Sequence, residues 1–165
     1  MDWDQIGEVS DYMLMVLGER YAKLTPVEQT QKLQEFLQKH YGVDALRQKQ
    51  RDDRHRILTL ERGDSLCGVM LLHWSSDSVF FEPAYKPQRS QTLALLVEQA
   101  IRIAGIWGYD TVTCRAFDTE KKLIRDLQAR GFEKKAGKLE GSAFTETPRC
   151  EWVKKFEPVR ASCTL

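Results

Sequence analysis

The sequence is poor in cysteine, and the cysteines that it has are scattered. The four are Cys67, Cys114, Cys150 and Cys163. No two of them have the CxxC spacing typical of zinc sites and redox centres, and the three histidines lie far apart, so a zinc site is not indicated. We expect reduced thiols, with Cys114 acting as a small apolar side chain rather than as a nucleophile.

An excess of charge of one sign is also missing. The chain has 25 lysines and arginines against 24 aspartates and glutamates, which gives a net charge of +1. Nucleic-acid-binding domains usually have a clear basic excess, so this balance argues against a nucleic-acid partner. The most basic stretch, RQKQRDDRHR at 47–56, contains two aspartates and is expected to be a solvated loop.

A long apolar run is absent too. Residues 93–107 are the most apolar stretch, but Glu98, Gln99 and Arg102 interrupt them, so we expect no membrane span. The opening residues, MDWDQIGEVSD, are acidic and lack the basic flank and apolar centre of a signal peptide. These features predict a cytoplasmic protein without a membrane partner.

Two helices are predicted in residues 1–43. The first has apolar residues at helical spacing from Ile6 to Tyr21. The pattern Thr25-Pro26-Val27-Glu28 is typical of a capping box, which would begin the second helix, and Gly42 would end it. The surface of this helical pair is a candidate binding site for a protein partner, because it contains Met13, Leu14, Met15 and Leu17.

From residue 54 the apolar period changes to two, and strands alternate with helices. Strands are predicted at 54–61, 66–74, 78–82, 109–116 and 150–156, with a weak one after Phe132. A hairpin turn is predicted at Gly63-Asp64, and Gly131 would end the last helix. This order predicts an α/β (mixed α+β) fold, with a central, mostly antiparallel sheet of about six strands flanked by about four helices.

Two segments, together with this order, resemble the GNAT superfamily of acyl-CoA-dependent N-acyltransferases. They are AIRIAGIWGYDTVTCRA at 100–116 and KKLIRDLQARGFEKKAG at 121–137, the second of which contains the pair Gly131-Phe132. The resemblance extends over roughly residues 54–157. It implies a single GNAT-like domain over 1–165, in which the helical pair of 1–43 precedes a sheet core with two helices at 54–157.

The resemblance also implies a cofactor site for acetyl-CoA. In this family, backbone N–H groups at the start of a helix bind the coenzyme pyrophosphate, with the pattern Gln or Arg, two residues, Gly, one residue, Gly or Ala. Here the pattern falls on Gln88, Arg89, Ser90, Gln91, Thr92 and Leu93. Either Gln88 or Arg89 matches its first position, but the middle glycine is absent in both registers. Phe81 and Pro83, on the strand before the loop, would contact the pantetheine arm.

For catalysis, the resemblance implies that Glu82 is the base that deprotonates an amine, directly or through water. The competing interpretation is a surface carboxylate at the end of a strand. The family's usual proton donor, a tyrosine four residues before the Gly-Phe pair, is replaced by Leu127. Tyr85 or Tyr109 is a candidate replacement. The acceptor amine would belong to a small molecule or to a protein.

Two functions follow from these observations. The first is an acyl-CoA-dependent N-acetyltransferase whose amine acceptor is unknown. The second is a catalytically inactive GNAT-fold protein that acts as a binding or assembly module through its N-terminal helices. Gln91, Leu93 and Leu127, and the lack of a strand before the first helix, favour the second. A V-shaped gap between the strands at 78–83 and 109–116 would favour the first.

Overall fold

The computed structural model describes residues 5–86 and 88–157 of the 165-residue chain. Six strands form one sheet in the order β1-β2-β3-β4-β6-β5. They are β1 (His55–Arg62), β2 (Ser65–Trp74), β3 (Val79–Ala84), β4 (Thr111–Phe117), β5 (Glu133–Lys134) and β6 (Arg149–Lys155). All neighbouring strands are antiparallel except β3 and β4, so the predicted mixed and mostly antiparallel sheet is confirmed.

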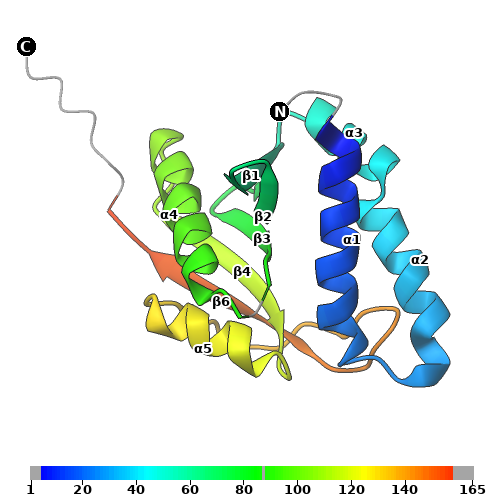
Figure 1. Cartoon of the computed structure of the whole chain (residues 1–165). Coiled ribbons are helices and arrows are strands. Elements are labelled where there is room, and N and C mark those ends of the chain that lie inside the picture. The colour runs from blue at the N-terminus through cyan, green and yellow to red at the C-terminus, as the bar shows by residue number, and fades with distance from the viewer. Residues whose placement is uncertain (1–4, 87, 158–165) are drawn as a thin grey trace, which may run out of the picture.

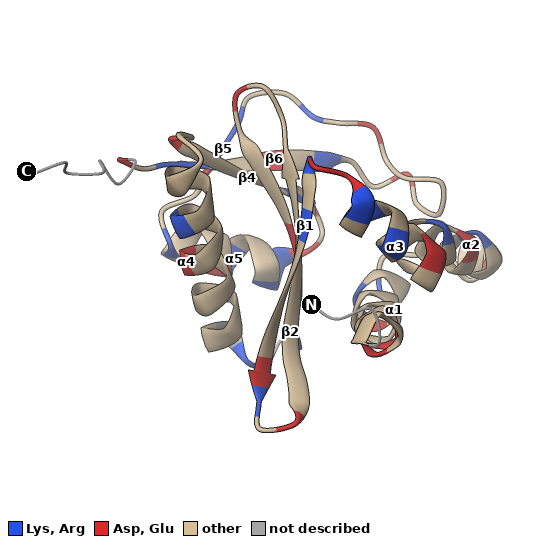
Figure 2. Ribbon diagram, turned by 90° about the horizontal axis from the view of Figure 1, so that it is seen from above, with Lys and Arg blue, Asp and Glu red and all other residues tan. Residues whose placement is uncertain are grey.

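Helices cover both faces of this sheet, which gives three layers (Figure 1). They are α1 (Ile6–Ala22), α2 (Thr30–Tyr41), α3 (Val43–Arg51), α4 (Ser90–Ile106) and α5 (Lys121–Ala129). Seen from above, α4 and α5 lie on one side of the sheet, and α1, α2 and α3 lie on the other (Figure 2). The first element of the described residues is a helix, so the expected lack of a preceding strand holds for them.

The helix α3 occupies the first half of the loop that was expected at 47–56, which corrects that prediction. Gly42 has an extended backbone (φ −65°, ψ 165°), which separates α3 from α2. Only Leu46 of this helix is fully buried, so the segment has no apolar period to read. Asp44 in the first turn and Lys49 in the last turn have charges that favour the helix dipole.

The capping box predicted at Thr25 is also corrected. The Thr25 hydroxyl donates to the carbonyl of Tyr21 at 2.6 Å, so it satisfies an orphan acceptor at the C-terminus of α1. Residues Val27–Gln29 form a short 3-10 helix, and α2 begins only at Thr30. The threonine therefore ends one helix instead of beginning the next.

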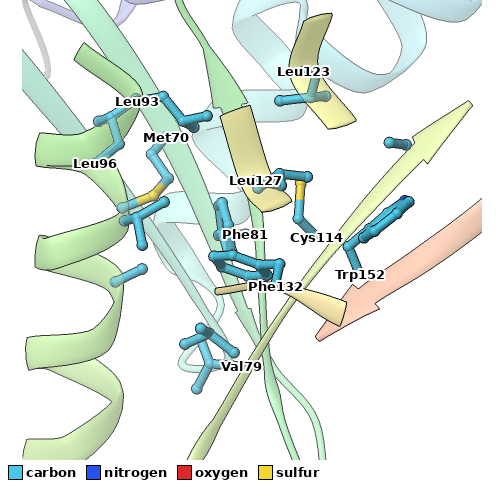
Figure 3. Packing of buried hydrophobic residues seen from close by; sticks show 14 of the residues in the cluster. Met70, Val79, Phe81, Leu93, Leu96, Cys114, Leu123, Leu127, Phe132 and Trp152 are labelled. Atoms are coloured by element: carbon cyan, nitrogen blue, oxygen red, sulfur yellow. The ribbon is translucent and has the colours of Figure 1, made fainter. Parts of the chain in front are cut away.

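The strand β2 is buried on both faces and separates two hydrophobic clusters. Met70 packs with α4, where it lies beside Leu93 and Leu96 (Figure 3). On the opposite face, Leu71 belongs to a second cluster with residues of α1 to α3. Met13 of α1 is fully buried there, so part of the methionine-rich stretch expected to be a partner surface belongs to the core.

The two parallel strands, β3 and β4, pair only at their beginnings. Val79 is opposite Val112 and Phe80 is opposite Thr113, and no pairing between them follows. Nevertheless β3 continues to Ala84 and β4 to Phe117. The strands therefore diverge after Phe80, which is the gap that the acyltransferase hypothesis anticipated.

Candidate active site

A cavity of about 380 Å³ lies beside the diverging end of β3, on the side of α1 to α3. We call it the β3 pocket. Glu82 reaches it because side chains alternate along a strand, so that Phe81 faces the α4 cluster and Glu82 faces the other way. Tyr41, the last residue of α2, donates its hydroxyl proton to Glu82 Oε2 at 2.7 Å. Burial and the nearby Glu82 carboxylate raise the pKa of Tyr41 well above its usual value, so this hydroxyl remains a donor.

Basic groups surround this tyrosine–carboxylate pair. Lys49 of α3 donates from Nζ to the carbonyl of His40 at 3.0 Å, and Nζ lies 5.3 Å from the centre of the Tyr41 ring. Burial lowers the pKa of Lys49 and also that of His40, which the Lys49 charge lowers further. His40 is therefore neutral near pH 7, and Lys49 places its charge beside the aromatic wall of the pocket.

Arg20 of α1 lies at the opening between the diverging strands. Its Nη1 donates to the carbonyl of Pro83 at 2.9 Å, and its Nε lies 2.8 Å from Glu120 Oε1. The second contact is an ion pair without hydrogen-bond alignment, because both atoms lack a hydrogen-bond partner despite their closeness. The two side chains are only 14% and 4% exposed. Burial alone would lower the pKa of Arg20, but Tyr21 and Glu120 raise it, so the guanidinium stays charged.

A second cavity of about 780 Å³ lies beyond Arg20, between the C-terminal part of α1, the residues after β3 and the start of α5. We call it the α5 groove. Arg20 lines both cavities. The basic side chains of the groove are Arg20, Lys23, Lys86, Lys121 and Lys122, and its carboxylates are Glu19 and Glu120. The groove therefore has a positive charge, which suits a ligand with phosphate groups.

The loop expected to bind the pyrophosphate borders this groove, and Gln88 lines it. Arg89 and Gln91 are exposed to solvent, whereas the side chain of Leu93 is fully buried in the α4 cluster. Two of the loop amides already have partners. Arg89 N donates to the carbonyl of Lys86 at 3.0 Å, and Thr92 N donates to the carbonyl of Arg89 at 2.9 Å.

The other expected site residues lie in different places. Phe81 packs against Phe132 in the α4 cluster (Figure 3), with ring centres 5.7 Å apart. Pro83 lines the β3 pocket next to Glu82. Ser90 opens α4. The structure thus brings Glu82 and Pro83 together, and it places Gln88 on the far side of Arg20.

The two tyrosines proposed as proton donors have different surroundings. Tyr85 lines the α5 groove, and its hydroxyl lies 3.5 Å from Asp126 Oδ2. Burial, and then the Asp126 charge, raise the pKa of Tyr85. Tyr109 instead donates to the carbonyl of Ser75 at 2.7 Å, away from both cavities. Tyr85 is therefore the tyrosine whose position suits the groove.

Cys114 belongs to the α4 cluster and lines neither the β3 pocket nor the α5 groove. Cys114 is fully buried, and burial raises the pKa of its thiol, which agrees with a small apolar side chain. Within residues 5–86 and 88–157, no group of three or more histidines, cysteines and acidic residues is arranged to hold a metal ion. Among the same residues, no helix has the length and apolarity needed to cross a membrane.

Sequence reasoning missed most of the charged residues around these cavities. Arg20 and Tyr41 were read only as parts of the N-terminal helices, and Arg149 lies just before the strand that was predicted at 150–156. Lys49 lies in the basic stretch that was expected to be a loop. The only available signal was the density of basic residues at 47–56.

Several solved structures with a similar arrangement of elements are acetyltransferases. The PaiA N-acetyltransferase from Thermoplasma acidophilum, in complex with coenzyme A, matches with a TM-score of 0.71 and 13% identity over 94% of this chain and 96% of its own. An acetyltransferase of the GNAT family from Streptococcus pneumoniae matches with a TM-score of 0.69 and 10% identity, over 95% and 96%. The chain has the GNAT fold. Aminoglycoside 6'-acetyltransferase type Ii also matches, with a TM-score of 0.67 and 12% identity, over 96% of each chain.

The two sequence-based comparisons do not add to the resemblance of the two segments at 100–116 and 121–137. A scan against protein-family models and a search of curated proteins found no match. The TM-scores of these three structures support a common GNAT fold. Because their sequence identities are only 10 to 13%, the chemistry has to be argued from this chain's own residues.

Proposed function

We propose that this GNAT-fold protein is an acyl-CoA-dependent N-acyltransferase that transfers an acetyl group to an amine. The observation that carries the proposal is the divergence of β3 and β4 after Phe80 and Thr113, with one cavity on each side of the opening. The β3 pocket, with Glu82, is the proposed acceptor site, and the α5 groove is the proposed cofactor site. The coenzyme A complex of the PaiA N-acetyltransferase supports the choice of cofactor.

The α5 groove fits a cofactor with phosphate groups by size and by charge. Its volume of about 780 Å³ lies within the usual range for ligand sites, roughly 300–1,000 Å³. Lys86, Lys121 and Lys122 would hold the phosphates, with Gln88 beside them. When bound there, acetyl-CoA would supply an activated acetyl thioester. The amides of Arg89 and Thr92 are already bonded within the loop, so side-chain charge has to carry more of the binding.

In the β3 pocket, a side chain of this protein removes a proton from the acceptor amine. An amine attacks a carbonyl only when it is deprotonated, and Glu82 is the carboxylate placed to take its proton. The hydrogen bond from Tyr41 fixes the orientation of that carboxylate. On the other side of the opening, the Tyr85 hydroxyl keeps its proton and is the proposed donor to the leaving thiolate.

A second candidate function is a GNAT-fold binding module without a cofactor, and one contact favours it. The guanidinium of Arg20 donates a hydrogen bond to the carbonyl of Pro83 and forms an ion pair with Glu120 across the opening between the strands. If that arrangement is permanent, it closes the route between the α5 groove and the β3 pocket. In that case the protein would not bind coenzyme A.

Calorimetric titration of the full chain with coenzyme A and acetyl-CoA separates these functions. We expect saturable binding and a thermal shift, since a ligand at 100 times its Kd stabilises a protein by about 2.7 kcal/mol. Lys121→Gln should weaken binding roughly fivefold, because an exposed charge pair contributes about 1 kcal/mol. The control Arg102→Gln, on the exposed side of α4, should leave it unchanged. No heat and no thermal shift at millimolar ligand would rule out the transferase and favour the binding module.

A further inference from the structure

The β3 pocket has more basic than acidic side chains. The basic ones are Arg20, Lys49, Arg115 and Arg149, and of the residues that the structure describes, Glu82 is the one carboxylate that lines the pocket. Arg20 and Arg115 have partners outside the pocket, since Arg20 pairs with Glu120 at 2.8 Å and Arg115 with Glu151 at 3.3 Å. Among the described residues, Lys49 and Arg149 have no carboxylate within ion-pairing distance. After this pairing, two cations remain against one carboxylate.

Within the described part of the chain, Arg149 has a guanidinium that lacks both an ion-pair partner and, at one buried atom, a hydrogen-bond acceptor. It is the first residue of β6, opposite Phe117 of β4, and its guanidinium carbon lies 5.8 Å from the centre of the Phe117 ring. Its Nε is buried and has no hydrogen-bond partner among the described residues. A buried donor without a partner is destabilising, because it has lost its hydrogen bonds to water and gained none in return. A planar guanidinium in this situation matches a carboxylate or a phosphate, which can accept two of its N–H groups at once.

Lys49 provides the second unmatched cation. Its ammonium has three donors, and one of them is used by the carbonyl of His40 at 3.0 Å. The charge of Lys49 also affects the protonation of His40. The pKa of His40 is lowered by burial first and then by Lys49, and the pKa of His73 is lowered by burial and then by His55. His40 and His73 are therefore neutral near pH 7, and the positive charges of the pocket that have no ion-pair partner among the described residues are those of Lys49 and Arg149.

The size of the pocket limits what it can bind. Its volume of about 380 Å³ is near the lower end of the range for small-ligand sites, roughly 300–1,000 Å³. Rings of Phe36, Tyr41 and Phe80 form much of its wall, so a bound anion would be partly shielded from water, and its attraction to a cation would be stronger than in bulk solvent. A small ligand with an anionic group satisfies both the size and the charge.

We propose that the β3 pocket binds a small primary amine that carries a carboxylate or a phosphate group. Arg149 and Lys49 hold the anionic group, and the amine faces Glu82. The fate of that amine rests on the proposed acyltransferase function, whereas recognition of the anion follows from the charges of the pocket alone. This assigns the acceptor to the class of amino acids and phosphorylated amines.

Binding can be measured without any turnover. The full chain is titrated by calorimetry with O-phosphoethanolamine and γ-aminobutyrate, and with their uncharged-tail counterparts ethanolamine and n-butylamine, both without cofactor and with saturating coenzyme A. We expect at least one anionic amine to bind tenfold or more tightly than its counterpart. The phosphate and carboxylate probes tell which of the two anions the pocket prefers.

Variants locate the binding. Arg149→Gln should reduce affinity for the preferred anionic amine tenfold or more, and Lys49→Gln provides an independent test if the first variant does not fold. Arg102→Gln, on α4, is the matched control and should change nothing. Equal affinity for anionic and neutral amines in both titrations overturns the proposal, and so does unchanged binding in a folded Arg149→Gln or Lys49→Gln protein.

The two proposals can fail separately. Selective binding of an anionic amine by a protein that does not bind coenzyme A would support the pocket assignment and refute the transferase. Coenzyme A binding without selectivity for anionic amines would do the reverse.

Discussion

Replacing Arg20 by methionine should destabilise the protein strongly, because it leaves Glu120 buried without a counter-charge. The Arg20 side chain is 14% exposed and the Glu120 side chain 4%, so water cannot replace the lost partner. Removing one member of a buried ion pair costs about 3–5 kcal/mol. The substitution also leaves the carbonyl of Pro83 without its donor. A domain of this size has about 5–15 kcal/mol of stability in total, so Arg20→Met should remain folded only marginally.

The double variant Arg20→Met, Glu120→Gln tests this reasoning. It removes both charges together, and the glutamine amide oxygen can still accept from Phe117 N, as Glu120 Oε2 does at 2.9 Å. We expect roughly half the cost of Arg20→Met or less, since a buried pair contributes little net stability once neither charge is left alone. Urea unfolding gives both values, with the exposed Arg102→Met as the control, expected within about 0.5 kcal/mol of the parent.

Two results would refute the argument. A cost of Arg20→Met below about 1 kcal/mol would mean that the pair is solvated like a surface ion pair. A double variant that costs as much as Arg20→Met or more would mean that removing the Glu120 charge brings no relief, so that the two charges do not interact. The same double variant examines the proposed function. If Arg20 blocks the opening, coenzyme A should bind to the double variant and not to the parent.

The remaining predictions concern the β3 pocket. Glu82→Gln should reduce kcat by 100-fold or more, within the usual contribution of a general base, whereas Tyr41→Phe should reduce kcat roughly tenfold with little change in KM, because it only releases the carboxylate. Steady-state kinetics with the preferred amine checks both, and a Tyr41→Phe protein with parent kcat would contradict the role. Desolvation by burial is the main cause that lowers the pKa of His73 in the folded protein below the ordinary histidine value of 6.5. The unfolded state therefore binds more protons than the folded state as the pH falls below 6.5, so the free energy of unfolding should decrease there. Melting temperatures at about pH 7.5 and 5.5 should show a smaller fall in His73→Gln.

Short-range signals predicted the sheet and its flanking helices well. Gly63 and Gly131 have positive φ angles of 63° and 87°, which glycine adopts without strain, and both end their elements where the sequence indicated. The apolar period of two predicted β1 and β2, and the full apolar stripe predicted α4. The misreadings at Thr25 and at α3 have a common cause. In both, the local pattern fits two structures, and a contact outside the segment decides between them.

The charged site could not be predicted in the same way, because it is assembled from distant elements. Arg20 comes from α1, Tyr41 and Lys49 from the ends of α2 and α3, and Arg149 from β6. Nothing in the spacing of these residues shows that they meet. Glu82 was the exception, because the resemblance assigned it to a particular strand. The structure places it on β3, where it lines the β3 pocket with an exposed side chain, and its role as a base stays a prediction.

The loop without glycines can be explained by packing on the strand below it. Thr92 is 7% exposed, and a Cβ placed on Gly68 of β2 would lie 2.9 Å from the Thr92 methyl group. Gly68 on the strand is therefore the small residue at this contact, and it leaves room for Thr92 in the loop. Leu93 is likewise required by the core. Gln91, Thr92 and Leu93 stand where the family pattern has glycine or alanine, and of these three Gln91 is exposed to solvent. The residues at 92 and 93 are explained by the packing of α4, so they do not by themselves argue against a cofactor. Whether the cofactor binds depends instead on Arg20 and on the lysines of the α5 groove.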